Sequence, residues 1–130
     1  MFSTPQVNIY SRDVPGAVRF YREVGFRETF RTPRQGIPIH VELELDGFKL
    51  GIASAASAAG DHGLELDLDS PGGGMEIALW TDDVDAAFAD FVDAGARALS
   101  APHDWLGGTL RVAWVADPDD NPVELIERRS

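Results

Sequence analysis

The sequence contains no cysteine, which excludes disulfide bonds, thiolate metal ligands and a cysteine nucleophile, and is compatible with a reducing compartment. It also lacks an N-terminal basic segment followed by an apolar one. No apolar run approaches the roughly 20 residues that cross a bilayer. A soluble cytoplasmic protein without a membrane partner is therefore expected.

Basic residues are scarce, since 11 Lys and Arg stand against 22 Asp and Glu, giving a formal net charge of -11. Nucleic acid and anionic lipid are excluded as partners because both need clustered positive charge. The imbalance lies in the second half: residues 1–60 carry six acids and seven bases, whereas residues 61–130 carry sixteen acids and four bases. Two interpretations stay open, a solubilising surface or an acidic cleft that favours a metal or a cationic ligand.

What the chain does contain is an internal repeat with an offset of 70 residues. The offset aligns Gln6 with Glu76 and Tyr10 with Trp80. It also aligns residues at helix-periodic positions, namely Asp13 with Asp83, Ala17 with Ala87, Tyr21 with Phe91 and Gly25 with Gly95. Two copies of one supersecondary unit must bury their apolar faces together. We therefore expect one domain over residues 1–130, with a first module at about 1–56, a linker at about 57–73 and a second module at about 74–130.

The first copy has the pattern of a βαβββ module. Alternation predicts a strand over residues 6–12, with Gln6, Asn8 and Tyr10 on its polar face. Asp13 as N-cap and Pro15 in the first turn predict a helix that ends at Gly25. Three strands should follow, at residues 26–32, 39–45 and 48–53, the last two joined by the hairpin signal Asp46-Gly47.

The second copy repeats this order, with a helix from the capping Asp83 to Gly95. Its inward face is predicted to hold Val84, Ala87, Phe88, Phe91 and Val92. Strands are expected at residues 75–81, 96–100, 109–116 and 122–127, with a turn at residues 117–121. Between the second and third of these strands, residues 102–108 are predicted to form a loop, either an ordinary surface loop or a gate with glycine hinges.

The motifs resemble those of the vicinal oxygen chelate superfamily, which includes glyoxalases, bleomycin-resistance proteins and extradiol dioxygenases. The resemblance covers essentially the whole chain, and the segments that carry it are Gln6-Val7-Asn8-Ile9-Tyr10-Ser11-Arg12-Asp13, Phe20-Tyr21, Gly25-Phe26, Asp117-Pro118-Asp119, Asn121 and Val123-Glu124-Leu125-Ile126. It implies an α+β fold of two tandem βαβββ modules whose mixed sheets curl into a cup, and it implies a homodimer.

Metal-dependent members of that superfamily place one ligand on the first and one on the last strand of each module. By resemblance these positions fall at Gln6, Gly51, Glu76 and Glu124, all on polar strand faces. Gly51 offers no side chain, so one ligand is missing. Gln6, Glu76 and Glu124 would suit Mg²⁺, Mn²⁺, Ni²⁺ or Zn²⁺. The alternative is that these residues line a water-filled cavity that holds no metal.

Other polar and aromatic side chains are candidate ligand-binding residues. Asn8, Tyr10 and Trp80 share strand faces with the predicted metal ligands, and His40 shares a face with Glu42 and Glu44. His103 and Trp105 stand in the predicted loop. His40 is either a proton carrier or a solvated surface residue. Trp80 and Trp114 are candidates either for a ligand-binding wall or for core and interface packing.

Two functions remain open at this point. The first is a glyoxalase-like lyase or isomerase that resembles lactoylglutathione lyase, in which a metal polarises a substrate carbonyl and Glu124 or Glu76 moves a proton. The second is a non-enzymatic protein that sequesters a cationic or aromatic antibiotic, as bleomycin-resistance proteins do. Extradiol dioxygenase and fosfomycin-modifying activities are not expected, because those members rely on two histidines at ligand positions. The sequence does not identify the small-molecule substrate.

Overall fold

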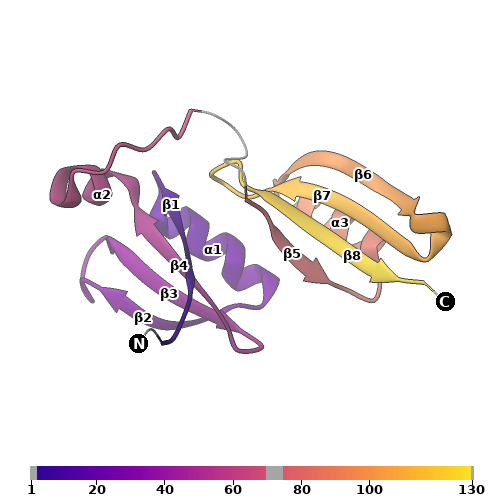
Figure 1. Ribbon diagram of the computed structural model, residues 1–130, viewed down its shortest axis with the longest axis horizontal. Coiled ribbons are helices and arrows are strands. Elements are labelled where there is room, and N and C mark those ends of the chain that lie inside the picture. The colour runs from indigo at the N-terminus through magenta and orange to yellow at the C-terminus, as the bar shows by residue number, and fades with distance from the viewer. Residues whose placement is uncertain (1–2, 70–74, 130) are drawn as a thin grey trace. The chain divides into compact units, whose positions relative to one another are not determined.

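The computed structural model describes residues 3–69 and 75–129, which fall into two compact units divided between Asp67 and Leu68. We call these units the first and second modules and describe each by itself (Figure 1). No helix in the described ranges is long and apolar enough to cross a membrane.

The first module contains four strands and one helix in βαβββ order, followed by a short second helix. Their bounds are β1 (Val7–Ser11), α1 (Val14–Val24), β2 (Arg27–Thr32), β3 (His40–Leu45), β4 (Phe48–Ser54) and α2 (Ala55–His62). The strands form a mixed sheet in the order β1-β4-β3-β2, with β1 parallel to β4 and the other pairs antiparallel.

Local signals in the sequence explain where these elements begin and end. The Asp13 side chain accepts a hydrogen bond from the Gly16 N–H and caps α1, and Gly25 ends the helix at a φ of 122° that an L-residue rarely adopts. The hairpin between β3 and β4 turns on Asp46 and Gly47, with φ values of 50° and 82°. Two successive positive φ values are the mark of the type I′ turn that fits the twist of the strands.

The core of the first module lies between its sheet and α1. Tyr21 is fully buried and makes edge-to-face contacts with the rings of Phe20 and Phe26. Opposite it, the alternate residues of the central strands, Val41, Leu43, Leu50 and Ile52, are also fully buried. Strand alternation therefore divides the sheet into a helix face and an opposite face, which we call the open face of the first module.

The second module has the same order of elements. They are β5 (Ile77–Trp80), α3 (Val84–Asp93), β6 (Arg97–Trp105), the 3₁₀ turn η1 (Leu106–Gly108), β7 (Leu110–Ala116) and β8 (Pro122–Arg128). The sheet order is β5-β8-β7-β6, with β5 parallel to β8. In Figure 1, α3 lies behind this sheet, and it contacts β6, β7 and β8.

The strand registers show that the two modules are structural repeats. Val7 pairs with Leu50 in the first module, and Ile77 pairs with Val123 at the same place in the second. First strands are thus offset by 70 residues and last strands by 73. The predicted α+β fold of two tandem βαβββ modules, each with a mixed four-stranded sheet, is confirmed.

Three local predictions differ from the structure. The first part of the predicted linker is helical, because residues 55–62 form α2, whose N-cap is Ser54; linker residues 70–73 lie outside the described residues. The predicted loop or gate at residues 102–108 is wrong for its first half, because β6 continues to Trp105 and only η1 forms the turn. Val92 of α3 is 40% exposed rather than inward, because the helical period places it about 80° around the helix axis from the buried Val84.

Candidate functional site

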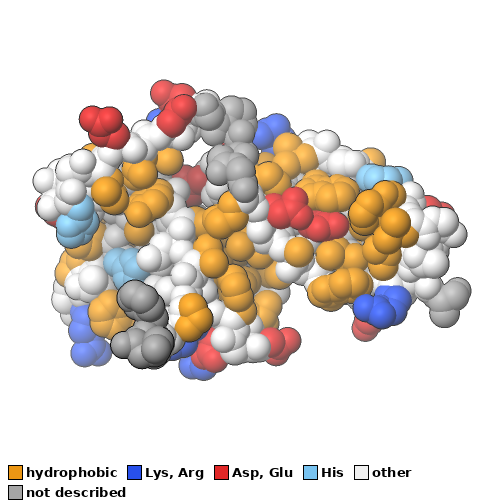
Figure 2. Space-filling model, viewed as in Figure 1, with side chains coloured by type: hydrophobic (Ala, Val, Ile, Leu, Met, Phe, Trp, Pro, Cys, Tyr) orange, Lys and Arg blue, Asp and Glu red, His pale blue; other side chains and the backbone are white. Residues whose placement is uncertain are grey.

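Most of the side chains that could bind a ligand or take part in a reaction lie on one face of the second module's sheet. This face points away from α3, and we call it the open face of the second module. Val123, Leu125 and Glu127 of β8 point to the α3 side, where Glu127 accepts a hydrogen bond from the Val84 N–H, so the alternate residues of β8 point the other way. Register pairing then places the following side chains on this open face: Ala78 and Trp80 of β5, Glu124, Ile126 and Arg128 of β8, Leu110, Val112 and Trp114 of β7, and His103 and Trp105 of β6. Figure 2 shows hydrophobic side chains around acidic ones on this module.

Glu76 and Glu124 form a carboxyl pair at one end of this face. Glu124 lies opposite Ala78 in the parallel register, and the exposed Glu76 reaches it from two residues upstream. Burial, a hydrogen bond that protonated Glu124 donates to the Glu76 carboxylate, and the nearby Glu76 charge together raise the pKa of Glu124 to about 7, from an ordinary value of 4.5. The pair therefore holds a proton more firmly than an exposed glutamate does, and the same two groups would bind a cation in its place.

Two ring side chains surround the carboxyl pair. The Trp114 indole Nε1–H donates to Glu76 Oε1 at 3.2 Å, and the His103 ring stacks on Trp114 with centroids 6.2 Å apart. His103 Nδ1 lies 2.7 Å from the Ala101 carbonyl oxygen. Because a carbonyl oxygen only accepts, Nδ1 carries the proton and Nε2 is left as the basic nitrogen of the neutral ring.

A pocket of about 510 Å³ lies at the opposite end of the same strands, lined by Trp80, Thr81, Asp82 and Arg128. The Arg128 guanidinium stands 5.2 Å from the centroid of the Trp80 ring, within the range of a cation–π contact. Trp80 is nevertheless 59% exposed, and Trp105, which pairs with Leu110 on the same face, is 54% exposed. Large aromatic surfaces are thus available to a ligand.

The open face of the first module has a different chemistry. Gln6 Nε2 donates to Asn8 Oδ1 at 2.8 Å, and Asn8 lies beside Gly51 in the register. A Cβ on Gly51 would collide with the Asn8 amide and would lie 3.1 Å from His40 Cε1. The space over Gly51 is therefore filled by its neighbours, which explains physically why the fourth predicted ligand position carries no side chain.

His40 and Tyr10 complete this face. His40 Nε2 lies 3.4 Å from Glu42 Oε2, and the His40 ring is 6.5 Å from the Phe30 ring. Tyr10 and His40 both pair with Ala53, so all three share one row of the sheet. Glu42 takes part in this cluster, although the sequence indicated it only as a neighbour of His40.

The structure thus brings together some of the predicted site residues and separates others. Glu76 and Glu124 meet, and His103 lies within the same aromatic group as Trp114; Trp80 and Trp105 lie further along that face. Gln6, Asn8, Tyr10 and His40 belong to the first module, so the predicted joining of Gln6 with Glu76 and Glu124 stays a prediction. Arg128 is the candidate that sequence reasoning missed, and the strand parity of residues 122–128 was the signal that could have found it. Trp114 was a candidate, but its bond to Glu76 was not predicted.

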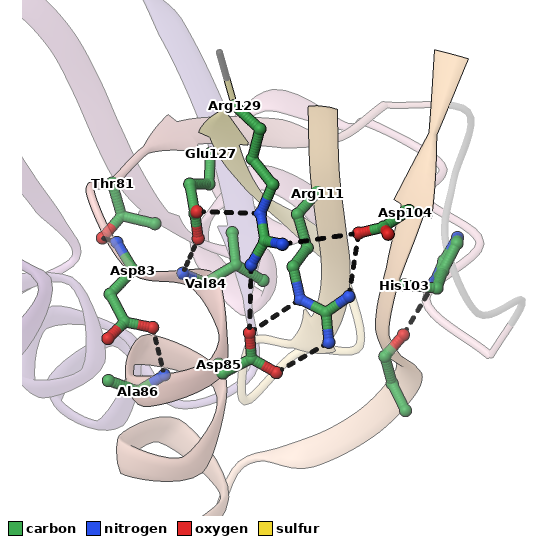
Figure 3. A network of polar contacts seen from close by, with 11 residues as sticks. Thr81, Asp83, Val84, Asp85, Ala86, His103, Asp104, Arg111, Glu127 and Arg129 are labelled. Atoms are coloured by element: carbon green, nitrogen blue, oxygen red, sulfur yellow. Dashed lines mark hydrogen bonds and ion pairs between the residues drawn. The ribbon is translucent and has the colours of Figure 1, made fainter. Parts of the chain in front are cut away.

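A second acidic cluster lies on the helix side of the second module, where oxygens of Asp83, Asp85 and Glu127 come within 4.8 Å of one another. Figure 3 shows that each of these groups is already engaged. Asp83 caps the Ala86 N–H, Glu127 accepts from the Val84 N–H, and Asp85 binds Arg111 at 2.7 and 2.9 Å. Arg129 adds a further positive charge, so this cluster anchors the start of α3 to β7 and β8.

The donor set of the carboxyl pair fits a divalent cation. Two carboxyl groups that share a hydrogen bond on a half-buried surface present oxygen ligands that suit hard or borderline metals. A bound cation would reduce the repulsion between the two negative charges, as a shared proton does. Trp114 donates to Glu76 Oε1, and each carboxyl has two oxygens that can act as ligands. The residues that would hold the ion are Glu76 and Glu124, with Gln6 as the predicted third ligand.

Comparisons with known proteins agree with this fold. The sequence model of the Glyoxalase/Bleomycin resistance protein/Dioxygenase superfamily matches residues 4–125. A glyoxalase-related enzyme from Fulvimarina pelagi is 23% identical with a TM-score of 0.78, covering 98% of this chain and 89% of its own. Lactoylglutathione lyase from Agrobacterium tumefaciens is 22% identical with a TM-score of 0.68 (98% and 95% covered).

The fosfomycin resistance protein FosX from Listeria monocytogenes is 13% identical, with a TM-score of 0.72 and with 99% of this chain and 95% of that chain covered. At these identities the structural likeness shows the fold. No curated protein matches the sequence.

Proposed function

Because the chain belongs to the Glyoxalase/Bleomycin resistance protein/Dioxygenase superfamily, we propose that it binds a small organic molecule on the open face of the second module. We propose further that Glu76 and Glu124 make it a metal-dependent lyase or isomerase. Lactoylglutathione lyase, one of the proteins with the same fold, carries such an activity in its name.

The carboxyl pair is the observation that supports this proposal. Two glutamates with like charge are placed where one raises the pKa of the other, and burial adds to the effect. An arrangement that costs free energy in the folded state is more common at a functional site than on an ordinary surface. The face around the pair is otherwise lined by rings and apolar side chains, which suits an organic ligand.

A bound divalent cation would supply a Lewis acid for a substrate oxygen. The chain's own residues account for the proton. A Glu124 carboxyl with a pKa of about 7 both accepts and returns a proton near neutral pH, which is the requirement for a general acid and base. The Trp114 N–H holds Glu76 in place, and His103 Nε2 offers a second basic atom on the same face.

Sequestration of an aromatic or cationic molecule is the second candidate. It is favoured by three tryptophans, Trp80, Trp105 and Trp114, on the open face of a module that carries most of the negative charge. Such a protein needs a lined cavity and no metal. A homodimer and a cytoplasmic location remain predictions under either function.

Metal binding separates the two candidates. Protein purified without chelators is analysed for metal, then stripped and titrated with Mn²⁺, Ni²⁺, Zn²⁺ and Mg²⁺ in an isothermal calorimeter. The lyase or isomerase proposal predicts one site per chain that Glu76→Gln and Glu124→Gln each weaken at least tenfold, since each removes a charged ligand. Glu42→Gln is the matched control, because it neutralises a half-buried glutamate on the other open face.

If the wild-type protein binds none of these ions, or if all three variants bind alike, the metal-dependent proposal is wrong and sequestration is favoured. A site weakened only in Glu76→Gln and Glu124→Gln argues against simple sequestration. Adding Gln6→Ala tests the predicted third ligand, which should weaken the same site without abolishing it.

A further inference from the structure

Arg128 differs from the other bases of the second module. That module contains four arginines, and three of them form ion pairs: Arg97 with Asp120, Arg111 with Asp85 and Asp104, and Arg129 with Glu127. Arg128 has no carboxylate partner among the described residues, although acids greatly outnumber bases in this part of the sequence. Its guanidinium carbon lies over the Trp80 ring, 5.2 Å from the ring centroid.

The position of Arg128 leaves its guanidinium donors available to a ligand. The side chain lines the pocket of about 510 Å³ together with Trp80, Thr81 and Asp82. A planar guanidinium stacked on an indole keeps its in-plane N–H groups free, and these match the two oxygens of a carboxylate. The exposed part of Trp80 offers a flat apolar surface next to them.

This pocket and the carboxyl pair lie on one face of the same two strands. Trp80 and Arg128 each follow the corresponding glutamate, Glu76 or Glu124, by four residues, which is about 13 Å along a strand. A ligand that reaches both places is therefore elongated, with one reactive end and one anchored end. The two ends also differ in charge, because the first holds two glutamates and the second holds one arginine and one aspartate.

We propose that Trp80 and Arg128 form a subsite for a planar group that carries a carboxylate or another oxyanion. This inference rests on the proposed function, since it describes the part of the ligand that lies away from Glu76 and Glu124. Arg128 pairs with the anionic group, and Trp80 stacks on the planar one. Asp82 at the pocket wall disfavours ligands with more than one negative charge there.

The subsite is tested with 2-naphthoate as a probe, because it combines two fused rings with one carboxylate. Its binding is followed by the indole N–H resonance of Trp80 in two-dimensional NMR spectra, assigned by its loss in Trp80→Phe. The expected result is a saturable shift of this resonance, with affinity that falls as salt is added.

Arg128→Gln should weaken 2-naphthoate binding about tenfold, because it removes the charge-assisted hydrogen bonds. Arg97→Gln is the matched control, since it removes the same charge from an exposed arginine that is paired with Asp120 at the start of β6. It should change the affinity less than twofold. Equal weakening in both variants would mean that only the overall charge matters, and would overturn the inference.

The uncharged 2-naphthylmethanol and the cationic 2-naphthylmethylamine complete the test. Both are expected to bind at least fivefold more weakly than 2-naphthoate. If the amine binds as tightly as 2-naphthoate, the acidic module selects cations and the subsite is not as proposed. Absence of a Trp80 shift with 2-naphthoate likewise overturns it, whereas metal binding at Glu76 and Glu124 is measured separately and decides the proposed function.

Discussion

The two modules share one backbone plan but place their polar side chains differently in the same row of the sheet. In the first module the row reads Asn8, Gly51 and Glu42 across β1, β4 and β3. In the second module the equivalent row reads Ala78, Glu124 and Trp114 across β5, β8 and β7. A large residue beside a glycine in one copy corresponds to a small residue beside a glutamate in the other.

This exchange of residues shows how two copies of one fold come to present different side chains on equivalent strands. The Asn8 amide occupies the space that a side chain at Gly51 would need, whereas Ala78 leaves room beside Glu124 for the Glu76 carboxyl. Packing on the open face therefore decides which last strand carries a carboxylate. The backbone hydrogen bonds do not decide it, because their register is equivalent in the two modules.

The helices differ as well. Four residues of α1 are buried, namely Val14, Ala17, Val18 and Tyr21, whereas Val84 is the buried residue of α3. The first module thus has the tighter core, and the second module combines a looser core with the carboxyl pair. Each contrast leads to a measurable difference between equivalent substitutions.

The largest expected effect comes from the paired aromatic residues of the two helices. Tyr21→Ala should lower the free energy of unfolding by about 3–5 kcal/mol, because it leaves a large cavity in a fully buried position. Phe91→Ala, at the equivalent but only half-buried position, should cost less than about half as much. Urea unfolding of both variants measures the difference, and equal costs would contradict the contrast between the cores.

The next effect is the pH dependence caused by Glu124. Its folded-state pKa of about 7 lies above the ordinary value of 4.5, so the folded state binds this proton more tightly than the unfolded state does. Stability from this group is complete below about pH 4.5 and is lost as the pH rises through 7. Allowing for solvent screening, the loss is on the order of 1–2 kcal/mol.

Glu124→Gln should remove this loss. Relative to the wild type, the variant should become about 1–2 kcal/mol more stable at pH 8 than at pH 5, which is roughly 4–8 °C in Tm for a chain of this size. Glu42→Gln serves as the control from the first module. Identical pH profiles of stability for the wild type and Glu124→Gln would show that the Glu124 pKa is not raised in the folded state.

A smaller effect tests the packing over Gly51. Gly51→Ala should cost about 1 kcal/mol, because its Cβ meets the Asn8 amide and crowds His40. In an Asn8→Ala background the same change should be neutral or stabilising, since alanine loses less backbone entropy than glycine in a strand. A double-mutant cycle in urea measures the coupling, and additive costs would mean that Asn8 does not fill this space.

The smallest difference is expected at the helix N-termini. Asp13 bonds the Gly16 N–H at 3.1 Å, and Asp83 bonds the Ala86 N–H at 3.0 Å. Asp13→Ala and Asp83→Ala should therefore each cost about 1 kcal/mol and differ by only a few tenths. Thermal unfolding of the two variants side by side checks this, and a cost for Asp83→Ala above about 2 kcal/mol would show that the acidic cluster depends on it.

Sequence alone predicted the features that depend on local periodicity. The 70-residue offset, the two capping aspartates and the hairpin at Asp46-Gly47 are local signals, and each led to the correct element. Strand parity also indicated that Glu124 faces away from Val123 and Leu125. The α2 helix was missed because residues 55–62 have a weak amphipathic pattern, and β6 was shortened because Pro102 and Gly107 resemble loop residues.

The contacts of the site depend on pairings between distant strands, which periodicity does not encode. The bond from Trp114 to Glu76 crosses β8, and the stacking of His103 on Trp114 follows from the register of β6 with β7 after two irregularities. The same holds for Arg128, which has no carboxylate partner within residues 3–69 and 75–129, whereas Arg97, Arg111 and Arg129 each have one. Residue types indicated which chemistry is possible, and the pairing of distant strands determined which of these residues lie together.

Titration of the Glu124 side-chain carboxyl by carbon-13 NMR tests the central claim most directly, namely that Glu76 and Glu124 form the functional pair of the second module. In metal-free protein the midpoint should lie at about 7, should fall in Glu76→Gln, and should fall by at least one unit when Zn²⁺ or Mg²⁺ is added. A midpoint below 5 that neither Glu76→Gln nor either cation changes would contradict it.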